Sequence, residues 1–173
     1  MTGYQKIRRA GIICLHCLRN IVLYKASYSN DLRIQDDQFL ISANSNFLDI
    51  AVLERCKIFG SVKEKHNWER IVIDNNLFEN GLHTKINCTK EEFSIYRNVM
   101  LIYRDKFVGH LDEEKMMDIP DLTKAIKSTI YLYQYLLETT DNPDIFSDAP
   151  ENAEAFYNLI FSLGKATYSK LTP

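Results

Sequence analysis

The sequence predicts an all-α protein, an antiparallel helical bundle of about four long helices plus short extra helices. Apolar residues recur at steps of three and four along several stretches, and this spacing places them on one face of a helix. No stretch sustains the alternation of apolar and polar residues that is typical of a strand. With 173 residues, 46% of them hydrophobic, the chain is long enough to bury a sizeable core as a single domain over residues 1–173.

The first two helices are expected over residues 4–28 and 36–58. The buried stripe of the first is predicted at Ile7, Gly11, Cys14, Leu18 and Ile21. The core face of the second is predicted at Phe39, Ala43, Phe47, Ile50 and Ala51, with Gly60 as its C-terminal cap. Three arginines lie off the first stripe, at positions 8, 9 and 19. We interpret them as a solvated helix face, with a nucleic-acid contact as the alternative.

The segment from Val62 to Gly81 is less regular and locally basic, with one short helix expected around Trp68, which we place in the core. A further helix is expected over residues 120–139, starting at Pro120. Its inward face is predicted at Leu122, Ile126, Thr129, Tyr133, Leu136 and Leu137. The last helix is expected from about residue 151 to 163, capped by Gly164, and the tail after it is expected to fray.

The central helix is expected over residues 90–110. Thr89 and Glu92 have the spacing of a capping box, in which side chains satisfy free amides of the first turn. An apolar stripe follows at Phe93, Tyr96, Met100, Tyr103 and Phe107, and His110 continues it. Arg97 and Arg104 are seven residues apart and share a face beside this stripe. Gly109 is expected to end or bend the helix.

This stretch also resembles a known family. The run Arg104-Asp105-Lys106-Phe107-Val108-Gly109-His110 fits the signature of the HEPN superfamily, an arginine and a polar residue followed after a short spacer by histidine. The flanking segments 47–60, 66–68, 103–112 and 119–122 resemble the abortive-infection, AbiU-like branch. The similarity covers roughly residues 35–140. The position before the histidine is expected to hold a small residue that is usually alanine, and this sequence has Gly109 there instead.

The resemblance implies a metal-independent endoribonuclease that cleaves RNA by attack of the ribose 2′-hydroxyl, in phage defence or a toxin-like role. His110 would act as base or acid near neutral pH. Arg104 would stabilise charge on the phosphate and Asp105 would orient either group, which makes these three the expected catalytic residues. Arg97 and Lys106 would bind RNA. The alternative, judged from spacing alone, is a satisfied core histidine with an arginine that reaches solvent.

One straight helix does not easily form this site. Six residues separate Arg104 from His110, so in an α-helix their side chains point about 120° apart and lie about 9 Å apart along the axis. Either Gly109 bends the chain, or two copies of the helix face each other across a two-fold axis. The resemblance favours the second solution, so we expect a homodimer.

Composition and charge leave other readings open. The net charge of −2 argues against broad electrostatic binding to nucleic acid, although a local basic patch is compatible with it. A HEPN-like domain that only binds RNA, a nucleotide or a protein therefore stays as the alternative function, and an antitoxin-like protein partner stays open. Motifs of P-loop proteins, HExxH metalloenzymes and GxSxG hydrolases do not occur in the sequence.

The cysteines and the apolar segments bear on location and metals. No apolar run reaches the length of a membrane span, and the first 18 residues lack a signal-peptide pattern, so we expect a cytoplasmic protein with reduced thiols. Cys14 and Cys17 have the spacing of a zinc half-site but lack a second close pair of ligands. We expect buried thiols there, and neither a metal nor a cofactor.

Overall fold

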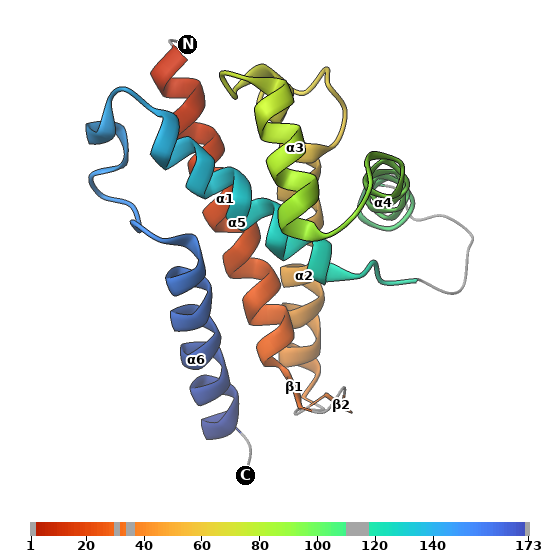
Figure 1. The fold of residues 1–173 in the computed structure, drawn as a ribbon. Coiled ribbons are helices and arrows are strands. Elements are labelled where there is room, and N and C mark those ends of the chain that lie inside the picture. The colour runs from red at the N-terminus through yellow and green to blue at the C-terminus, as the bar shows by residue number, and fades with distance from the viewer. Residues whose placement is uncertain (1–2, 30–31, 34–36, 110–117, 172–173) are drawn as a thin grey trace.

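The computed structural model describes residues 3–29, 32–33, 37–109 and 118–171, and these residues form an all-α bundle, as predicted (Figure 1). The long helices are α1 (Gly3–Ala26), α2 (Gln38–Phe59), α5 (Leu122–Thr139) and α6 (Ala153–Leu171). Two shorter helices are α3 (Asn75–Ile86) and α4 (Lys90–Tyr103). Single turns lie at η1 (Trp68–Arg70), η2 (Arg104–Gly109) and η3 (Pro143–Phe146).

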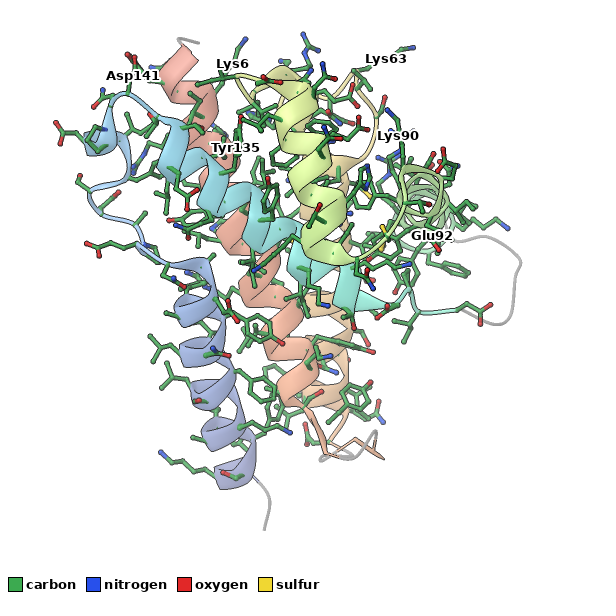
Figure 2. All side chains as sticks on the ribbon, viewed as in Figure 1. Lys6, Lys63, Lys90, Glu92, Tyr135 and Asp141 are labelled. Atoms are coloured by element: carbon green, nitrogen blue, oxygen red, sulfur yellow. The ribbon has the colours of Figure 1, made fainter. Side chains whose placement is uncertain are left out.

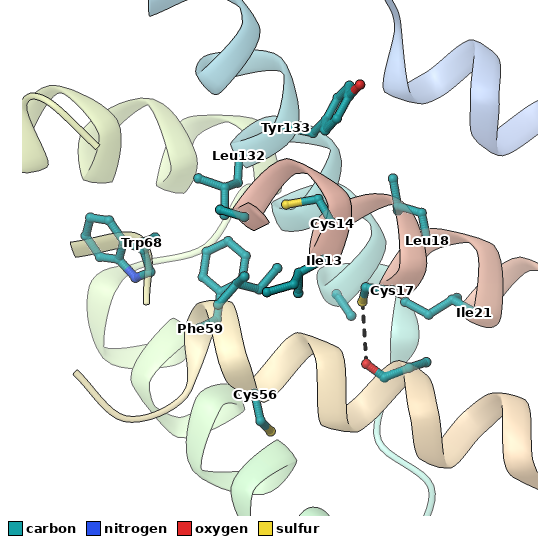
Figure 3. Close-up of a cluster of buried hydrophobic side chains, with 14 of the residues drawn as sticks. Ile13, Cys14, Cys17, Leu18, Ile21, Cys56, Phe59, Trp68, Leu132 and Tyr133 are labelled. Carbon is teal, nitrogen blue, oxygen red and sulfur yellow. Dashed lines mark hydrogen bonds between the residues drawn. The ribbon is translucent and has the colours of Figure 1, made fainter. Parts of the chain in front are cut away.

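Helix α1 is the centre of the bundle. It packs against α2, α5 and α6, and α3 packs against α5. In Figure 1, α1 and α6 run downward while α2 and α5 run upward, so α1 is antiparallel to α2 and α5 and parallel to α6. The core lies between α1, α2 and α5, where Leu18, Phe59 and Leu132 are fully buried (Figure 3). The apolar stripe of α1 explains this position, because a helix contacted on several sides must bury most of its surface.

The predicted core face of α2 is only partly right. Ala51 is buried and Ala43 and Phe47 are half-buried, but Phe39 is 78% exposed and Ile50 is 42% exposed. Besides Ala51, the buried face carries Leu48, Val52, Cys56, Ile58 and Phe59, together with two polar residues, Asn44 and Arg55. The guanidinium of Arg55 lies 4.1 Å from the centre of the Phe59 ring, which gives a buried cation a favourable aromatic contact. A helix with apolar residues on all sides gives no clear face from periodicity alone.

Two further elements differ from the sequence prediction. Helix α6 continues to Leu171 through Gly164, which was predicted to end it. A Cβ at Gly164 would lie 2.8 Å from the Cβ of Ala26, so this glycine lets α6 approach α1 closely. Residues Tyr28–Ser29 (β1) and Leu32–Arg33 (β2) form a two-residue antiparallel pair that periodicity did not predict, because alternation cannot be recognised over two residues.

The ends of the helices follow the expected capping chemistry. Gly60 follows α2 and its amide donates to the carbonyl of Cys56. Asp37, Asp74 and Asp121 accept hydrogen bonds from first-turn amides of α2, α3 and α5. None of the helices in the described ranges has the length and apolar character needed to cross a bilayer.

Candidate functional site

The site predicted around Arg104 lies at the end of α4, and the start of that helix forms as expected. The Glu92 amide donates to the Thr89 hydroxyl at 3.1 Å, and the Thr89 amide donates to the Glu92 carboxylate at 2.8 Å. This is the predicted capping box. The predicted stripe is buried at Phe93, Tyr96, Met100 and Tyr103 and half-buried at Phe107.

The helix changes geometry at Arg104. From Arg104 to Gly109 the backbone is a π-helix, in which each amide bonds five residues back instead of four. The predicted straight α-helix therefore ends at Tyr103, and the angle calculated for an ideal α-helix does not apply beyond it. Short π-helical segments are rare and frequently occur at functional sites. The described part of this element ends at Gly109, where the sequence predicted an exit or a bend.

Arg104 and Asp105 form an ion pair on this π-helical turn. The guanidinium Nε donates to the Asp105 carboxylate at 2.7 Å. The hydrogen bond raises the pKa of Arg104 above its ordinary value, so the side chain stays charged. The Arg104 side chain is 25% exposed and that of Asp105 is 59% exposed, so the pair lies at the surface and remains accessible. The structure thus brings together two of the three predicted catalytic residues.

The third predicted catalytic residue, His110, lies outside the described residues. Of the two predicted RNA-binding residues, Arg97 lies apart from the ion pair and Lys106 lies next to it on the π-helical turn. Arg97 lines a cavity of about 230 Å³ between α3 and α4, beside Phe93 and His83, and neither Arg104 nor Asp105 lines that cavity. The Nε of Arg97 is buried and has no hydrogen-bond partner among the described residues. Lys106 lies half-buried on the π-helical turn.

Helix α2 holds the π-helical turn in place through buried polar contacts that the sequence did not reveal. The Tyr103 hydroxyl donates to Asp49 at 3.4 Å, and the Cys56 thiol donates to the carbonyl of Met100 at 3.7 Å. Burial raises the pKa of Asp49, while the Tyr103 hydrogen bond lowers it. Figure 3 shows the Cys56 side chain directed away from the α1–α5 core. The only sequence signal for these contacts was the buried position of Tyr103 on the α4 stripe.

Cys14 and Cys17 are buried free thiols, as we expected. Burial raises the pKa of both thiols, that of Cys17 to about 12. The Cys17 thiol donates to the carbonyl of Ala51, the hydrogen bond drawn in Figure 3. Within the described residues, no three His, Cys, Asp or Glu side chains gather as a metal site would require.

Comparison with known proteins adds no assignment. No protein-family model, curated protein or solved structure matches the chain. The resemblance to the HEPN superfamily therefore stays a prediction from the motif residues of this sequence.

Proposed function

We propose that this chain is a HEPN-like, metal-independent endoribonuclease whose site is built on the turn from Arg104 to His110. The observation that carries the proposal is the accessible Arg104–Asp105 ion pair on a π-helical turn whose described part reaches Gly109, the residue before His110 in the sequence. A surface ion pair of this kind contributes only about 0–1 kcal/mol, so it leaves Arg104 available to a stronger ligand. The Nε of Arg104 donates to Asp105, and the two terminal amino groups remain suited to a phosphate.

The proposed reaction needs only side chains. His110 takes the proton of the ribose 2′-hydroxyl, and the 2′-oxygen attacks the adjacent phosphorus. The bond to the 5′-oxygen breaks, and that oxygen accepts a proton. The products are a 2′,3′-cyclic phosphate and a free 5′-hydroxyl. Arg104 stabilises the negative charge that grows on the phosphate oxygens, and Asp105 fixes the guanidinium in position.

A homodimer that completes the site is part of this proposal. Helix α4 carries an exposed apolar stripe at Ile95, Val99 and Ile102, which are 65%, 43% and 53% exposed. At about 100° per residue, this stripe lies roughly 180° around the helix from Arg104. Pairing through the stripe would therefore leave Arg104 on the far side. A composite site requires the two copies to meet at the π-helical turn instead.

Complementation distinguishes a composite site from one made within a single chain. Arg104→Ala and His110→Ala proteins are each expected to be inactive, and they would be mixed under conditions that exchange subunits. If each site takes Arg104 from one copy and His110 from the other, half the dimers are mixed and each holds one intact site. About a quarter of wild-type cleavage then returns for a two-fold dimer. No recovery from a mixture shown to contain mixed dimers would refute the composite site.

The cleavage proposal is tested with purified protein in excess chelator. Wild type and His110→Ala are incubated with a transfer RNA pool and with mixed single-stranded RNA, and the products are analysed for cyclic phosphate ends. We expect cleavage by the wild type and none by the variant. Cleavage retained by a well-folded His110→Ala protein would refute the assignment.

One observation favours a second function. The Arg104–Asp105 pair is complete without a ligand, which is also what a structural ion pair would look like. In that case the domain binds RNA, a nucleotide or a protein partner without cleaving it. Binding of an RNA that stays intact, with equal affinity for wild type and His110→Ala, would support this second function. For the active enzyme, the resemblance supports phage defence or a toxin-like role in the cytoplasm, restrained by an antitoxin-like partner.

A further inference from the structure

A basic pocket lies between α1, α2 and the loop that follows α2, separate from the residues proposed for cleavage. Its volume is about 610 Å³, within the range of ligand-binding pockets. Its basic and imidazole side chains come from three places in the chain: Arg9 and His16 on α1, Lys57 on α2, and Lys63, Lys65 and His66 on the loop. Figure 2 shows Lys63 at the upper edge of the molecule with its side chain extended into solvent.

The pocket concentrates positive charge on a protein that is acidic overall. Four side chains of Arg or Lys line it against two carboxylates, Glu54 and Glu64, which gives a local charge of +2 on a chain of net charge −2. Lys57 is paired with Glu54 at 3.0 Å. Among the described residues, Arg9, Lys63 and Lys65 form no ion pair. With Lys57 and Glu54 paired, three cations remain around the pocket against the single carboxylate of Glu64, and this excess of positive charge favours an anion.

The loop that carries half of these groups is held in a fixed shape. Two consecutive turns close through hydrogen bonds from the Glu64 amide to the Ser61 carbonyl and from the Asn67 amide to the Glu64 carbonyl. The Asn67 side chain is fully buried. Its amide donates to the carbonyls of Gly60 and Ser61, and its oxygen accepts from the Glu69 amide. The backbone positions of Lys63, Lys65 and His66 are therefore set before any ligand arrives, which lowers the entropy lost on binding.

His66 supplies a polar group at the wall of the pocket. Its Nε2 is buried and has no hydrogen-bond partner among the described residues. Burial lowers the pKa of His66, and the nearby cations Arg9, Lys57 and Lys65 lower it further, while Glu64 opposes them. The imidazole is therefore neutral at pH 7, and an anion in the pocket would favour its protonated form.

We propose that this pocket binds phosphate groups, with Arg9, Lys63 and Lys65 as the charged contacts and His66 as a hydrogen-bonding group. Its volume exceeds that of a single phosphate and suits two or more linked phosphates. Apart from the two imidazoles, no described residue that lines it is aromatic, so the pocket lacks a surface on which a base would stack. The ligand is thus recognised by its phosphates, which belong either to a nucleic-acid backbone or to a small polyphosphate. This inference does not depend on RNA cleavage.

The test is a binding measurement that no ribonuclease activity can disturb. A fluorescent deoxyuridine oligonucleotide, which lacks the 2′-hydroxyl, is titrated with the full chain at about 50 mM salt, a condition that favours phosphate contacts. The pocket variant is Lys63→Ala/Lys65→Ala. The control is Lys127→Ala/Lys170→Ala, which removes two exposed lysines from α5 and α6. Circular dichroism confirms that each variant is folded.

We expect the pocket variant to bind about tenfold more weakly and with a shallower salt dependence, because two phosphate contacts are lost. The control should bind like the wild type. Inorganic pyrophosphate and inorganic phosphate are then added as competitors. If pyrophosphate displaces the oligonucleotide at a much lower concentration than phosphate does, the site is assigned to the linked phosphates of small molecules. If neither competitor displaces the oligonucleotide, the site is assigned to the nucleic-acid backbone. Equal loss in the pocket variant and the control, or no binding of any probe by wild type, would overturn the proposal.

Discussion

Asn67 is the residue on which the loop of the basic pocket most depends, and Asn67→Ala measures that dependence. The substitution removes three hydrogen bonds at once: those to the carbonyls of Gly60 and Ser61, and that from the Glu69 amide. The site is fully buried, so water does not readily replace them. At roughly 1 kcal/mol for each bond, the free energy of unfolding should fall by about 3 kcal/mol. For a chain of this size that lowers the Tm by roughly 6–12 °C.

The assay is thermal unfolding followed by circular dichroism, combined with oligonucleotide binding at a temperature where both proteins are folded. Asn20→Ala is the matched control, because the Asn20 amide makes one exposed hydrogen bond, to His16 within α1. It should change stability by less than about 0.5 kcal/mol. We expect Asn67→Ala to weaken oligonucleotide binding even though it removes no charge, because the loop is no longer held. A Tm within about 2 °C of wild type would correspond to a loss of only about 0.5 kcal/mol in the free energy of unfolding, as for substitution of an exposed residue. That result would refute this reasoning.

Two further predictions concern the same loop, and a third concerns the proposed cleavage site. Gly60→Ala places a Cβ 2.3 Å from the carbonyl oxygen of Cys56. The substitution should lower the free energy of unfolding by about 1–3 kcal/mol in a denaturant titration. An unchanged midpoint of denaturant unfolding would contradict the close contact. Oligonucleotide affinity should rise as the pH falls from neutral, because the pKa of His66 is lowered and its imidazole can take up a proton when the anion binds. His66→Gln should flatten this pH dependence. An identical pH profile in the variant would exclude a role of His66 in binding. Arg104→Gln should reduce RNA cleavage about 10²–10³-fold. Asp105→Asn should reduce it much less, since the side-chain amide oxygen of the new asparagine can still accept the hydrogen bond from Arg104. An equal loss in the two variants would assign a direct role to the Asp105 carboxylate.

Local signals predicted the parts of the fold that local chemistry determines. The capping box at Thr89, the cap at Gly60 and the buried Trp68 are all present. Each depends on residues within a few positions of one another, or on the strong preference of one large side chain for the core. The class and the approximate bounds of α1, α2 and α5 were predictable for the same reason.

The register of α2 was not predictable, because it depends on which polar residues the core accepts. Arg55 is 1% exposed, and its guanidinium lies against the rings of Phe59, Phe93 and Tyr96. The rings of Phe93 and Tyr96 belong to α4, about 40 residues later in the sequence. Periodicity assigns an arginine to the solvent face, so it rotated the predicted helix away from its true orientation. Contacts between distant segments decided the outcome.

In the candidate site as well, contacts between neighbouring residues were predictable, and other features were not. The ion pair of Arg104 with Asp105 joins adjacent residues and lies within the predicted motif. The change to a π-helix at Arg104 has no signal in composition or spacing that we recognised. Arg9 was interpreted as part of a solvated face together with Arg8 and Arg19. Arg8 pairs with Asp148 at the surface and Arg9 is exposed, as that interpretation requires. It did not reveal that Arg9 lines the basic pocket together with a loop more than 50 residues away.

The two proposed sites share one structural support, the C-terminal half of α2. On one side, Cys56 contacts α4 just before the π-helical turn; on the other, Lys57 lines the basic pocket. The carboxylate of Glu64 acts on both, since it raises the pKa of Arg104 and opposes the lowering of that of His66. A phosphate bound in the pocket would therefore lie against α2, the helix that also contacts the π-helical turn of the proposed cleavage residues. Contacts made equally in the bound substrate and in the transition state lower KM without raising kcat. If one RNA strand occupies both sites, loss of the pocket lysines should raise KM alone, whereas loss of Arg104 should lower kcat.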